Sequence, residues 1–261
     1  MKTSAIITAE DKLNHLKTLF YLLRMRAAYE RLTSILSDPD ECGMSALDCI
    51  YEIMENEVQR RDSNALARRL KEAKICLPNA RPDTIDFSIE RGLDKNKIDA
   101  LLTMRWMEEH QNIIITGAAG CGKTFLACAL VNQACIKGRT ARVVRVPLLL
   151  NQMAASHQIV ETYFKKLKEM KTIDLLVLDD WGIGQLDARS RQDLLEIINE
   201  RYMYASTIVT SVLPVNKWSE YINDTTYSDA ILDRLVSVSH RVELNGASVR
   251  QMKEYGAVLK E

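Results

Sequence analysis

One stretch of the sequence has residue types and spacing that suit polyphosphate binding. It reads GAAGCGKT and matches the pattern G-x-x-x-x-G-K-[ST]. Glycines let such a loop turn its backbone N–H groups inward, and a helix starting at about Gly122 adds the positive end of its dipole. The candidate phosphate-binding residues are Gly117, Ala118, Ala119, Gly120, Cys121, Gly122, Lys123 and Thr124.

Two side chains of this stretch could act on the phosphates directly. The Lys123 ammonium would reach the β- and γ-phosphates, and the Thr124 hydroxyl would bind a Mg²⁺ ion that bridges them. The alternative is a glycine-rich turn between strand and helix that binds no ligand. The position of the stretch, after an apolar strand and before a helix, favours a nucleoside triphosphate with Mg²⁺ as ligands.

A second candidate element is the run Leu175–Leu178, which is followed by Asp179 and Asp180. Ligands of open α/β sheets bind at the carboxyl ends of the strands. Asp179 is therefore the candidate Mg²⁺ partner, through water, and Asp180 the group that orients or polarises an attacking water. A strand that simply ends in solvated acids is the alternative.

Two further segments could complete the site. Thr210 and Ser211 end another apolar strand with hydroxyls that could contact the γ-phosphate or the lytic water, although turn capping would also explain them. Arg234 stands among apolar residues of a predicted amphipathic helix, and its guanidinium could reach a phosphate across a subunit boundary. The alternative for Arg234 is an interaction within its own helix, with Asp233 or near Ala230.

The nucleotide is predicted to be ATP. A motif of the type that reads guanine, N-K-x-D, occurs at Asn96–Asp99, and Asp179–Gly182 fits D-x-x-G. In GTPases the guanine-reading motif comes from a strand after the phosphate loop, whereas this copy precedes the loop on a predicted helix.

The elements that must position these residues form an α/β pattern. Short apolar runs alternate with longer helical segments, which is typical of a parallel sheet with helices on both faces. The runs are 113–115, 143–146, 175–178 and 208–209. Residues 240–244 alternate polar and apolar side chains instead, which predicts a strand near an edge of the sheet.

The amino-terminal part is predicted to be helical. Thr8–Asp11 fits a capping box at the start of one long helix that ends before Asp38, and a second helical run follows Ser45. In that run five apolar residues share one side: Leu47, Ile50, Tyr51, Met54 and Val58. Pro78 and Pro82 indicate an irregular connector. We expect a helical domain over 1–80 that binds DNA or a partner, a linker and lead-in helix over 81–110, and a nucleotide-binding domain over 111–261.

Composition excludes several classes of protein. The 261 residues are 47% apolar, with 35 basic and 35 acidic side chains, which excludes disordered and uniformly basic proteins. The six cysteines form no C-x-x-C pair, so we expect reduced thiols rather than a zinc site or a disulfide framework. The sequence has neither a secretory segment nor a membrane span, and we expect a cytoplasmic protein.

Two segments are locally basic despite the zero net charge. Between Val58 and Arg81 seven basic residues face two acidic ones, and between Lys137 and Lys171 eight face two. Such clusters can bind duplex DNA through its phosphate backbone without reading sequence, and the low aromatic content of 6% argues against base stacking. A solvated helix face is the alternative, above all for Lys165–Lys171.

Taken together, these motifs resemble the IstB-like ATP-binding proteins, the helper ATPases of a class of bacterial insertion sequences and relatives of the DnaC helicase loaders within the AAA+ ATPases. The resemblance covers nearly the whole length. It rests on ERGLDKNKIDALLTMRWMEEHQNIIITGAAGCGKTFLACAL, LLVLDDWGIGQLDARSRQDLLEIINERY, STIVTSVLPVNKW and DAILDRLVSVSHRVELNGASVR, with LKTLFYLLRMRAAYERL similar to the leading helix of the family.

The resemblance implies a role for each candidate residue. Gly117–Thr124 would be the Walker A motif and Asp179 with Asp180 the Walker B motif. Thr210 and Ser211 would be sensor 1, Arg234 the arginine finger and Arg250 a weaker candidate for sensor 2. Three residues depart from the family pattern: Arg24 replaces a usual glycine, Val212 stands where a polar side chain is frequent, and Asp180 replaces a glutamate.

The implied function is that of an ATP-dependent AAA+ regulator of transposition. It would assemble as a homo-oligomer on DNA, recruit a transposase and be reset by ATP hydrolysis. The runner-up is a DnaC-like helicase loader. Two further alternatives are a small-molecule phosphotransferase and a scaffold that binds ATP without cleaving it.

Overall fold

The computed structural model describes residues 8–38, 40–41, 43–246 and 248. The chain divides into two compact units, Met1–Ala67 and Arg68–Glu261. Each unit is described by itself. In the described part of the chain, every helix is too short or too polar to cross a lipid bilayer.

The first unit contains α1 (Ala9–Leu22), α2 (Arg26–Ser37) and most of α3 (Ala46–Glu72), which continues into the second unit. The predicted capping box is confirmed, because the Thr8 hydroxyl accepts a hydrogen bond from the Asp11 N–H. The prediction of one long first helix is wrong. The chain leaves the helix at Leu23 and turns at Arg24, which has a φ of 55°, before α2 begins.

The turn at Arg24 predicts a stabilising substitution. A left-handed φ disfavours any side chain with a Cβ, so Arg24→Gly is expected to raise the free energy of unfolding by up to about 1 kcal/mol. Urea denaturation of the full chain would measure this change. The control Lys17→Gly, on an exposed position inside α1, is expected to lower the same free energy by about 1 kcal/mol. A loss of stability in Arg24→Gly would contradict the prediction.

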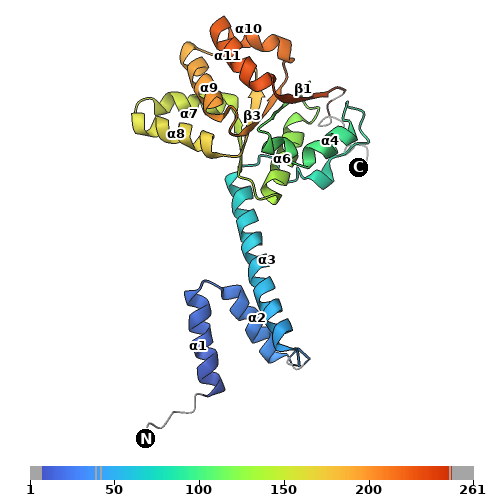
Figure 1. Cartoon of the computed structure of the whole chain (residues 1–261). Coiled ribbons are helices and arrows are strands. Elements are labelled where there is room, and N and C mark those ends of the chain that lie inside the picture. The colour runs from blue at the N-terminus through green and yellow to red at the C-terminus, as the bar shows by residue number, and fades with distance from the viewer. Residues whose placement is uncertain (1–7, 39, 42, 247, 249–261) are drawn as a thin grey trace, which may run out of the picture. The chain divides into compact units, whose positions relative to one another are not determined.

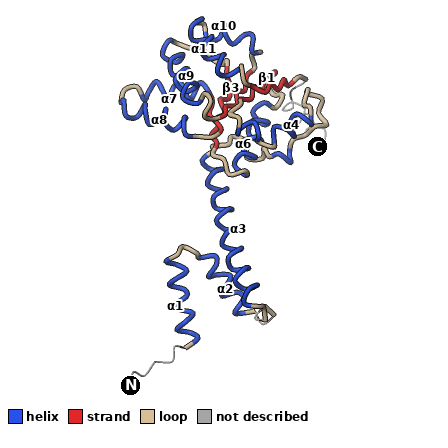
Figure 2. Tube along the Cα trace, viewed as in Figure 1, coloured by secondary structure: helices blue, strands red, loops and turns tan. Residues whose placement is uncertain are grey.

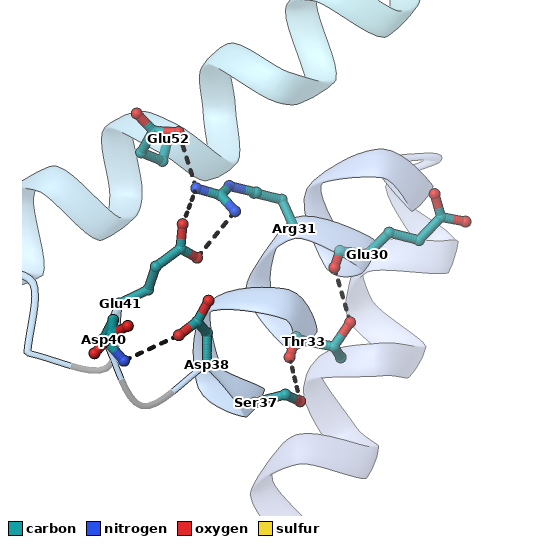
Figure 3. Close-up of polar contacts among 8 residues, drawn as sticks. All are labelled: Glu30, Arg31, Thr33, Ser37, Asp38, Asp40, Glu41 and Glu52. Atoms are coloured by element: carbon teal, nitrogen blue, oxygen red, sulfur yellow. Dashed lines mark hydrogen bonds and ion pairs between the residues drawn. The ribbon is translucent and has the colours of Figure 1, made fainter.

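Only a small part of the first unit is buried. Its core consists of Ala28, Ile35 and Ile53. The five apolar residues predicted on one side of α3 do share that side, but all five are exposed. The loop between α2 and α3 is tied down by Arg31, whose guanidinium donates to the Glu41 carboxylate at 3.0 and 3.1 Å and to Glu52 on α3 at 3.3 Å (Figure 3).

The second unit contains a parallel sheet of five strands. They are β1 (Asn112–Gly117), β2 (Ala141–Arg145), β3 (Leu175–Trp181), β4 (Ser206–Ser211) and β5 (Ser239–Leu244), in the order β2-β3-β4-β1-β5. All neighbouring strands pair in parallel. The predicted α/β architecture is confirmed, and so is the position of residues 240–244 at an edge of the sheet.

Helices cover both faces of this sheet, as Figures 1 and 2 show. On one face α6 (Lys123–Ile136) packs against β1, β2, β3 and β4. The other face carries α7 (Val146–Ser156), α8 (Val160–Thr172), α9 (Ala188–Arg201), α10 (Trp218–Ile222) and α11 (Thr225–Val236). The connector before β1 contains η1 (Pro82–Thr84), α4 (Lys95–Leu102) and α5 (Arg105–Glu108), and η2 (Val215–Lys217) precedes α10.

The strands read as continuous apolar runs because both of their faces are covered. Ile114, Leu176, Leu178 and Val209 belong to the core cluster on the α7–α11 face. Their neighbours along each strand, such as Ile113 and Val177, are fully buried on the α6 side. Because β4 pairs in parallel with both β1 and β3, the carboxyl ends of these three strands lie side by side at the same end of the sheet.

Candidate functional site

The loop between β1 and α6 has a backbone that only glycine can adopt at its key positions. Gly117 has a φ of 148°, and a Cβ there would lie 2.2 Å from the Leu244 carbonyl oxygen of β5. Gly122 has a φ of 101°, and a Cβ there would lie 2.5 Å from the Arg91 guanidinium. Both glycines are needed for the loop to wrap closely between β5 and the connector.

The Lys123 side chain lies folded into this loop. Lys123 is buried, and its ammonium donates to the carbonyl oxygens of Gly117 at 2.8 Å and Ala118 at 2.7 Å. The Lys123 charge is therefore held within the loop, at the start of α6, where the positive end of the helix dipole adds to it.

Three side chains from different elements meet beside the loop. The Thr124 hydroxyl at the start of α6 donates to Asp179 Oδ1 at 2.9 Å. The Thr210 hydroxyl, at the end of β4, donates to the same oxygen. Because β4 lies between β1 and β3, the sheet order itself places Thr210 between the loop and the acidic pair. The structure thus joins Thr124, Asp179 and Thr210 by hydrogen bonds, next to the loop that holds Lys123.

An irregularity in β3 decides how its two acids point. Leu178 pairs with Val209 and Trp181 pairs with Ser211, so β3 has one residue more than β4 in this interval. As a result, Leu178 and Trp181 both face the core cluster under α7–α11 although three positions separate them. The bulge, with a φ of 62° at Asp180, keeps both carboxylates out of that core.

Asp180 has a partner that the sequence analysis counted only as part of a basic segment. Arg145, the last residue of β2, donates from Nε to Asp180 Oδ2 at 2.7 Å. This hydrogen bond raises the pKa of Arg145 above its usual value. The Asp180 backbone N–H donates to the Thr210 hydroxyl at 3.2 Å, which links both acids to Thr210. The rule that strand ends carry ligands could have pointed to Arg145, since it is a charged residue near the end of the predicted strand 143–146.

Ser211 and Arg234 lie apart from these groups. Ser211 is fully buried, donates to the Trp181 carbonyl at 2.8 Å and accepts from the Leu213 N–H at 3.0 Å, contacts typical of turn capping. Arg234 lies at the opposite end of β1, where its backbone carbonyl accepts from the Asn112 side chain. Its guanidinium donates to the Ala230 carbonyl within α11 and lies 5.7 Å from the centre of the Tyr202 ring.

Two further predictions can be placed on the described chain. The motif Asn96–Asp99 lies on α4, as expected, and Lys97 is exposed there. Arg250, the weaker sensor 2 candidate, lies outside the described residues.

A pocket beside the loop includes residues that the sequence analysis missed. Its volume is about 300 Å³, and it is lined by the loop and α6 on one side and by the connector on the other, including Leu77, Asn79, Ile89 and Arg91. Arg91 is 5% exposed, donates to the Cys121 carbonyl at 3.4 Å and to the Asp86 carbonyl at 2.9 Å, and burial lowers its pKa. The signal for Arg91 in the sequence was weak, a single arginine before Gly92.

Two cysteine sulfurs lie close together, one on α6 and one in the connector. Cys128 on α6 is buried, and burial raises the pKa of its thiol to about 12. Its sulfur lies 3.7 Å from that of Cys76 in the connector, and both thiols are free. At neutral pH the Cys128 thiol is therefore protonated and packs as a small apolar side chain.

Comparison with known proteins identifies relatives along the whole chain. The family model described as IstB-like ATP binding protein matches residues 3–257. An insertion sequence ATP-binding protein of Sinorhizobium fredii is 39% identical over 241 residues, which cover 92% of this chain and 95% of the relative.

Two solved structures share the fold of a large part of this chain. The DnaC helicase loader superposes with a TM-score of 0.54 at 19% identity and covers 64% of this chain and 98% of its own. AMPPCP-bound DnaA from Aquifex aeolicus superposes with a TM-score of 0.54 at 21% identity and covers 70% of this chain and 55% of its own. These similarities show the P-loop AAA+ fold.

Proposed function

Because the chain belongs to the family of IstB-like ATP binding proteins, we propose that it is an ATP-hydrolysing AAA+ regulator of transposition. It assembles as a homo-oligomer on duplex DNA, recruits a transposase and is reset by hydrolysis. The observation that supports the ATPase most directly is the meeting of Thr124, Asp179 and Thr210 beside Lys123 at one edge of the sheet.

The loop residues bind and orient the triphosphate in this proposal. Backbone N–H groups of the loop and the Lys123 ammonium hold the β- and γ-phosphates, for which the Gly117 and Ala118 carbonyls must release the ammonium. Thr124 and Asp179 offer the hard oxygen atoms that Mg²⁺ prefers, and they already lie 2.9 Å apart. When bound there, Mg²⁺ neutralises charge that develops on the phosphates.

The acids and the arginine complete the reaction centre. Asp180 accepts a hydrogen bond from the attacking water, and Thr210, which contacts both acids, holds them in place. Arg234 cannot serve its own loop, because β1 separates them by about 17 Å at ~3.3 Å per residue. It acts instead on the γ-phosphate bound by a neighbouring subunit, which makes hydrolysis depend on assembly.

The pocket of about 300 Å³ beside the loop takes the base and sugar of ATP in this proposal. Arg91 holds its wall to the loop, so Arg91→Ala is expected to weaken ATP binding about three- to tenfold, the loss of one or two hydrogen bonds. Titration with a fluorescent ATP analogue would measure the change, and Arg91→Lys is expected to recover part of it. Unchanged affinity in Arg91→Ala would contradict this use of the pocket.

Duplex DNA is proposed as the surface of assembly because of the two basic segments. Arg142, Arg145 and Lys166 of the second segment all line one hollow of the second unit, so part of the basic charge is gathered in space and not only in sequence. Phosphate release by the purified full chain, with and without duplex, tests the proposal. We expect DNA-stimulated turnover together with ATP-dependent oligomers in light scattering.

The partner is tested in the same preparation. The protein is first assembled on a DNA-coated surface, and the transposase encoded by the same insertion element is then passed over it. We expect the assembled protein to bind and retain that transposase. If the assembled protein retained a replicative helicase instead of the transposase, its function would be that of a helicase loader. If a metabolite stimulated ATP turnover and DNA did not, the protein would be a small-molecule phosphotransferase. If the protein bound ATP but did not hydrolyse it, it would be a scaffold.

A further inference from the structure

Two cysteines that the proposed function leaves unused lie close enough to react with each other. Cys76 belongs to the connector and Cys128 to α6, and both are in the second unit. Their sulfur atoms are 3.7 Å apart, in van der Waals contact. A disulfide bond of about 2.05 Å therefore requires the sulfurs to approach by roughly 1.7 Å, which is a small movement for an exposed side chain such as Cys76.

The backbone on either side of Cys76 is fixed, so its position beside α6 is set by packing. The carbonyl oxygen of Ala73 accepts a hydrogen bond from the Val143 N–H of β2 at 2.9 Å. On the other side, the Ala80 N–H donates to the Leu77 carbonyl at 2.9 Å. Ala73 and Ala80 are both fully buried. The contact between the two sulfurs is therefore a property of the folded second unit.

Cys76 is open to small molecules, and its surroundings attract anions. It is the one exposed cysteine in the part of the chain that the structure describes. It lines a hollow of about 410 Å³ at the edge of β2, where one acid, Glu169, is outnumbered by four cations: Lys74, Arg142, Arg145 and Lys166. Exposure and nearby positive charge are features of reactive cysteines. The reagent that suits this hollow is a small anionic disulfide, of which oxidised glutathione is an example.

The pair would react with such a disulfide in two steps. In the first, the Cys76 thiolate attacks one sulfur of the small disulfide and forms a mixed disulfide, and the other half leaves as a thiolate that takes up the proton lost by Cys76. In the second, the Cys128 sulfur attacks that of Cys76, the bond to the small thiol breaks, and the Cys128 proton passes to the leaving thiolate. Two cysteines are oxidised, and one small disulfide is reduced to two thiols. Burial raises the pKa of Cys128 to about 12, which makes the second step the slower one.

A bond between these sulfurs would join the two walls of the pocket proposed for the base and sugar of ATP. Leu77, next in the chain to Cys76, lines this pocket from the connector side. Thr124 and Phe125 line it from α6, about one helical turn before Cys128. The approach of the sulfurs draws these walls toward each other. The pocket, with a volume of about 300 Å³, then has less room for the nucleotide.

We propose that Cys76 and Cys128 form a thiol–disulfide exchange site for small anionic disulfides, and that closure of the internal disulfide lowers the affinity for ATP. The second part rests on the proposed function, in which the pocket beside the loop takes the base and sugar. Bound ATP must then disfavour the internal disulfide by the same factor by which the disulfide weakens ATP binding. ATP binding thereby depends on the balance of thiols and disulfides around the protein.

The first experiment follows the chemistry by mass spectrometry and needs no nucleotide. The full chain is treated with oxidised glutathione, its remaining thiols are blocked, and it is digested with trypsin without reduction. Wild type is expected to yield peptide 75–91 joined to peptide 124–137, with the glutathione released. Cys128→Ala is expected to keep glutathione on Cys76. Because Cys135 lies in the same tryptic peptide as Cys128, Cys135→Ala is the matched control and is expected to form the same bond as wild type.

Two results of that experiment would refute the exchange site. One is Cys76 that stays reduced or keeps its glutathione in wild type at equilibrium, since the internal bond would then not form. The other is a link between the same two peptides in Cys128→Ala, which would make Cys135 the partner of Cys76. Circular dichroism of each variant checks that it folds as wild type does.

The second experiment measures the ATP affinity of the reduced and the internally linked protein with a fluorescent ATP analogue. The linked wild type is expected to bind ATP about three- to tenfold more weakly, the loss of one or two contacts in the pocket, and dithiothreitol is expected to restore binding. Cys76→Ser, which cannot form the bond, is expected to bind alike before and after oxidation. Equal or tighter binding by the linked wild type would overturn the effect on ATP. A chain that forms the internal disulfide but binds no ATP in either state would support the exchange site and refute the proposed function.

Discussion

Arg234→Ala is expected to lower ATP turnover of the assembled protein by about three to five orders of magnitude, the range found when an arginine that acts on the transferred phosphate is removed. Nucleotide binding should change little, because Arg234 lies at the far end of β1 from the loop of its own subunit. Its local contacts, with the Ala230 carbonyl and the Tyr202 ring, are compatible with a side chain that can turn toward a neighbour. Phosphate release under saturating ATP measures the loss.

Mixing two inactive variants tests whether Arg234 acts between subunits. Arg234→Ala keeps an intact loop and both acids, and Asp180→Asn keeps an intact Arg234 and a loop that binds ATP, so a mixed oligomer contains interfaces with both working parts. Turnover is expected to return on mixing, while mixtures of either variant with Arg105→Ala, an exposed arginine on α5, report the effect of dilution alone. Full activity of Arg234→Ala as an isolated subunit would contradict the mechanism.

Lys123→Ala is expected to weaken ATP binding by about two orders of magnitude and to abolish ATP-dependent assembly. The ammonium is buried in the loop and donates two hydrogen bonds there, and each charged hydrogen bond to phosphate is worth ~1.5–3 kcal/mol. A fluorescent ATP analogue measures affinity, and light scattering with and without ATP measures assembly.

A matched control separates this effect from a general loss of charge. Lys97→Ala removes an exposed lysine of α4, within the motif N-K-x-D, and is expected to change neither ATP affinity nor the preference for ATP over GTP. Circular dichroism of both variants checks that they fold. Assembly of Lys123→Ala that still depends on ATP would contradict the assigned role of the lysine.

The local elements of this protein could be predicted from the sequence because their signals are local. The apolar runs of β1 to β4, the glycine pattern of the loop and the capping box at Thr8 each depend on neighbours within a few residues. Where a signal was weak, prediction failed. The turn at Arg24 carries a left-handed residue without a glycine, and so the sequence indicated one continuous helix instead of two.

The pairing of side chains between elements was decided by the tertiary structure. That Asp179 and Asp180 lie near the end of a strand is evident in the sequence, but the bulge that contains them depends on how β3 pairs with β4. Arg145 meets Asp180 and Arg91 meets the loop across 35 and 30 residues of chain, respectively. Neither the composition nor the periodicity of a sequence indicates which residues far apart in the chain lie within hydrogen-bonding distance of each other.

The sequence by itself therefore determined the chemistry available to this protein: a phosphate-binding loop, two acids and an α/β scaffold to carry them. The tertiary structure decided which groups restrain each other, namely Arg145 on Asp180, Thr210 on Asp179 and Arg91 on the loop. The physical reason is that hydrogen bonds act over about 3 Å. Only the packing of the sheet and its helices sets separations on that scale between residues far apart in the chain.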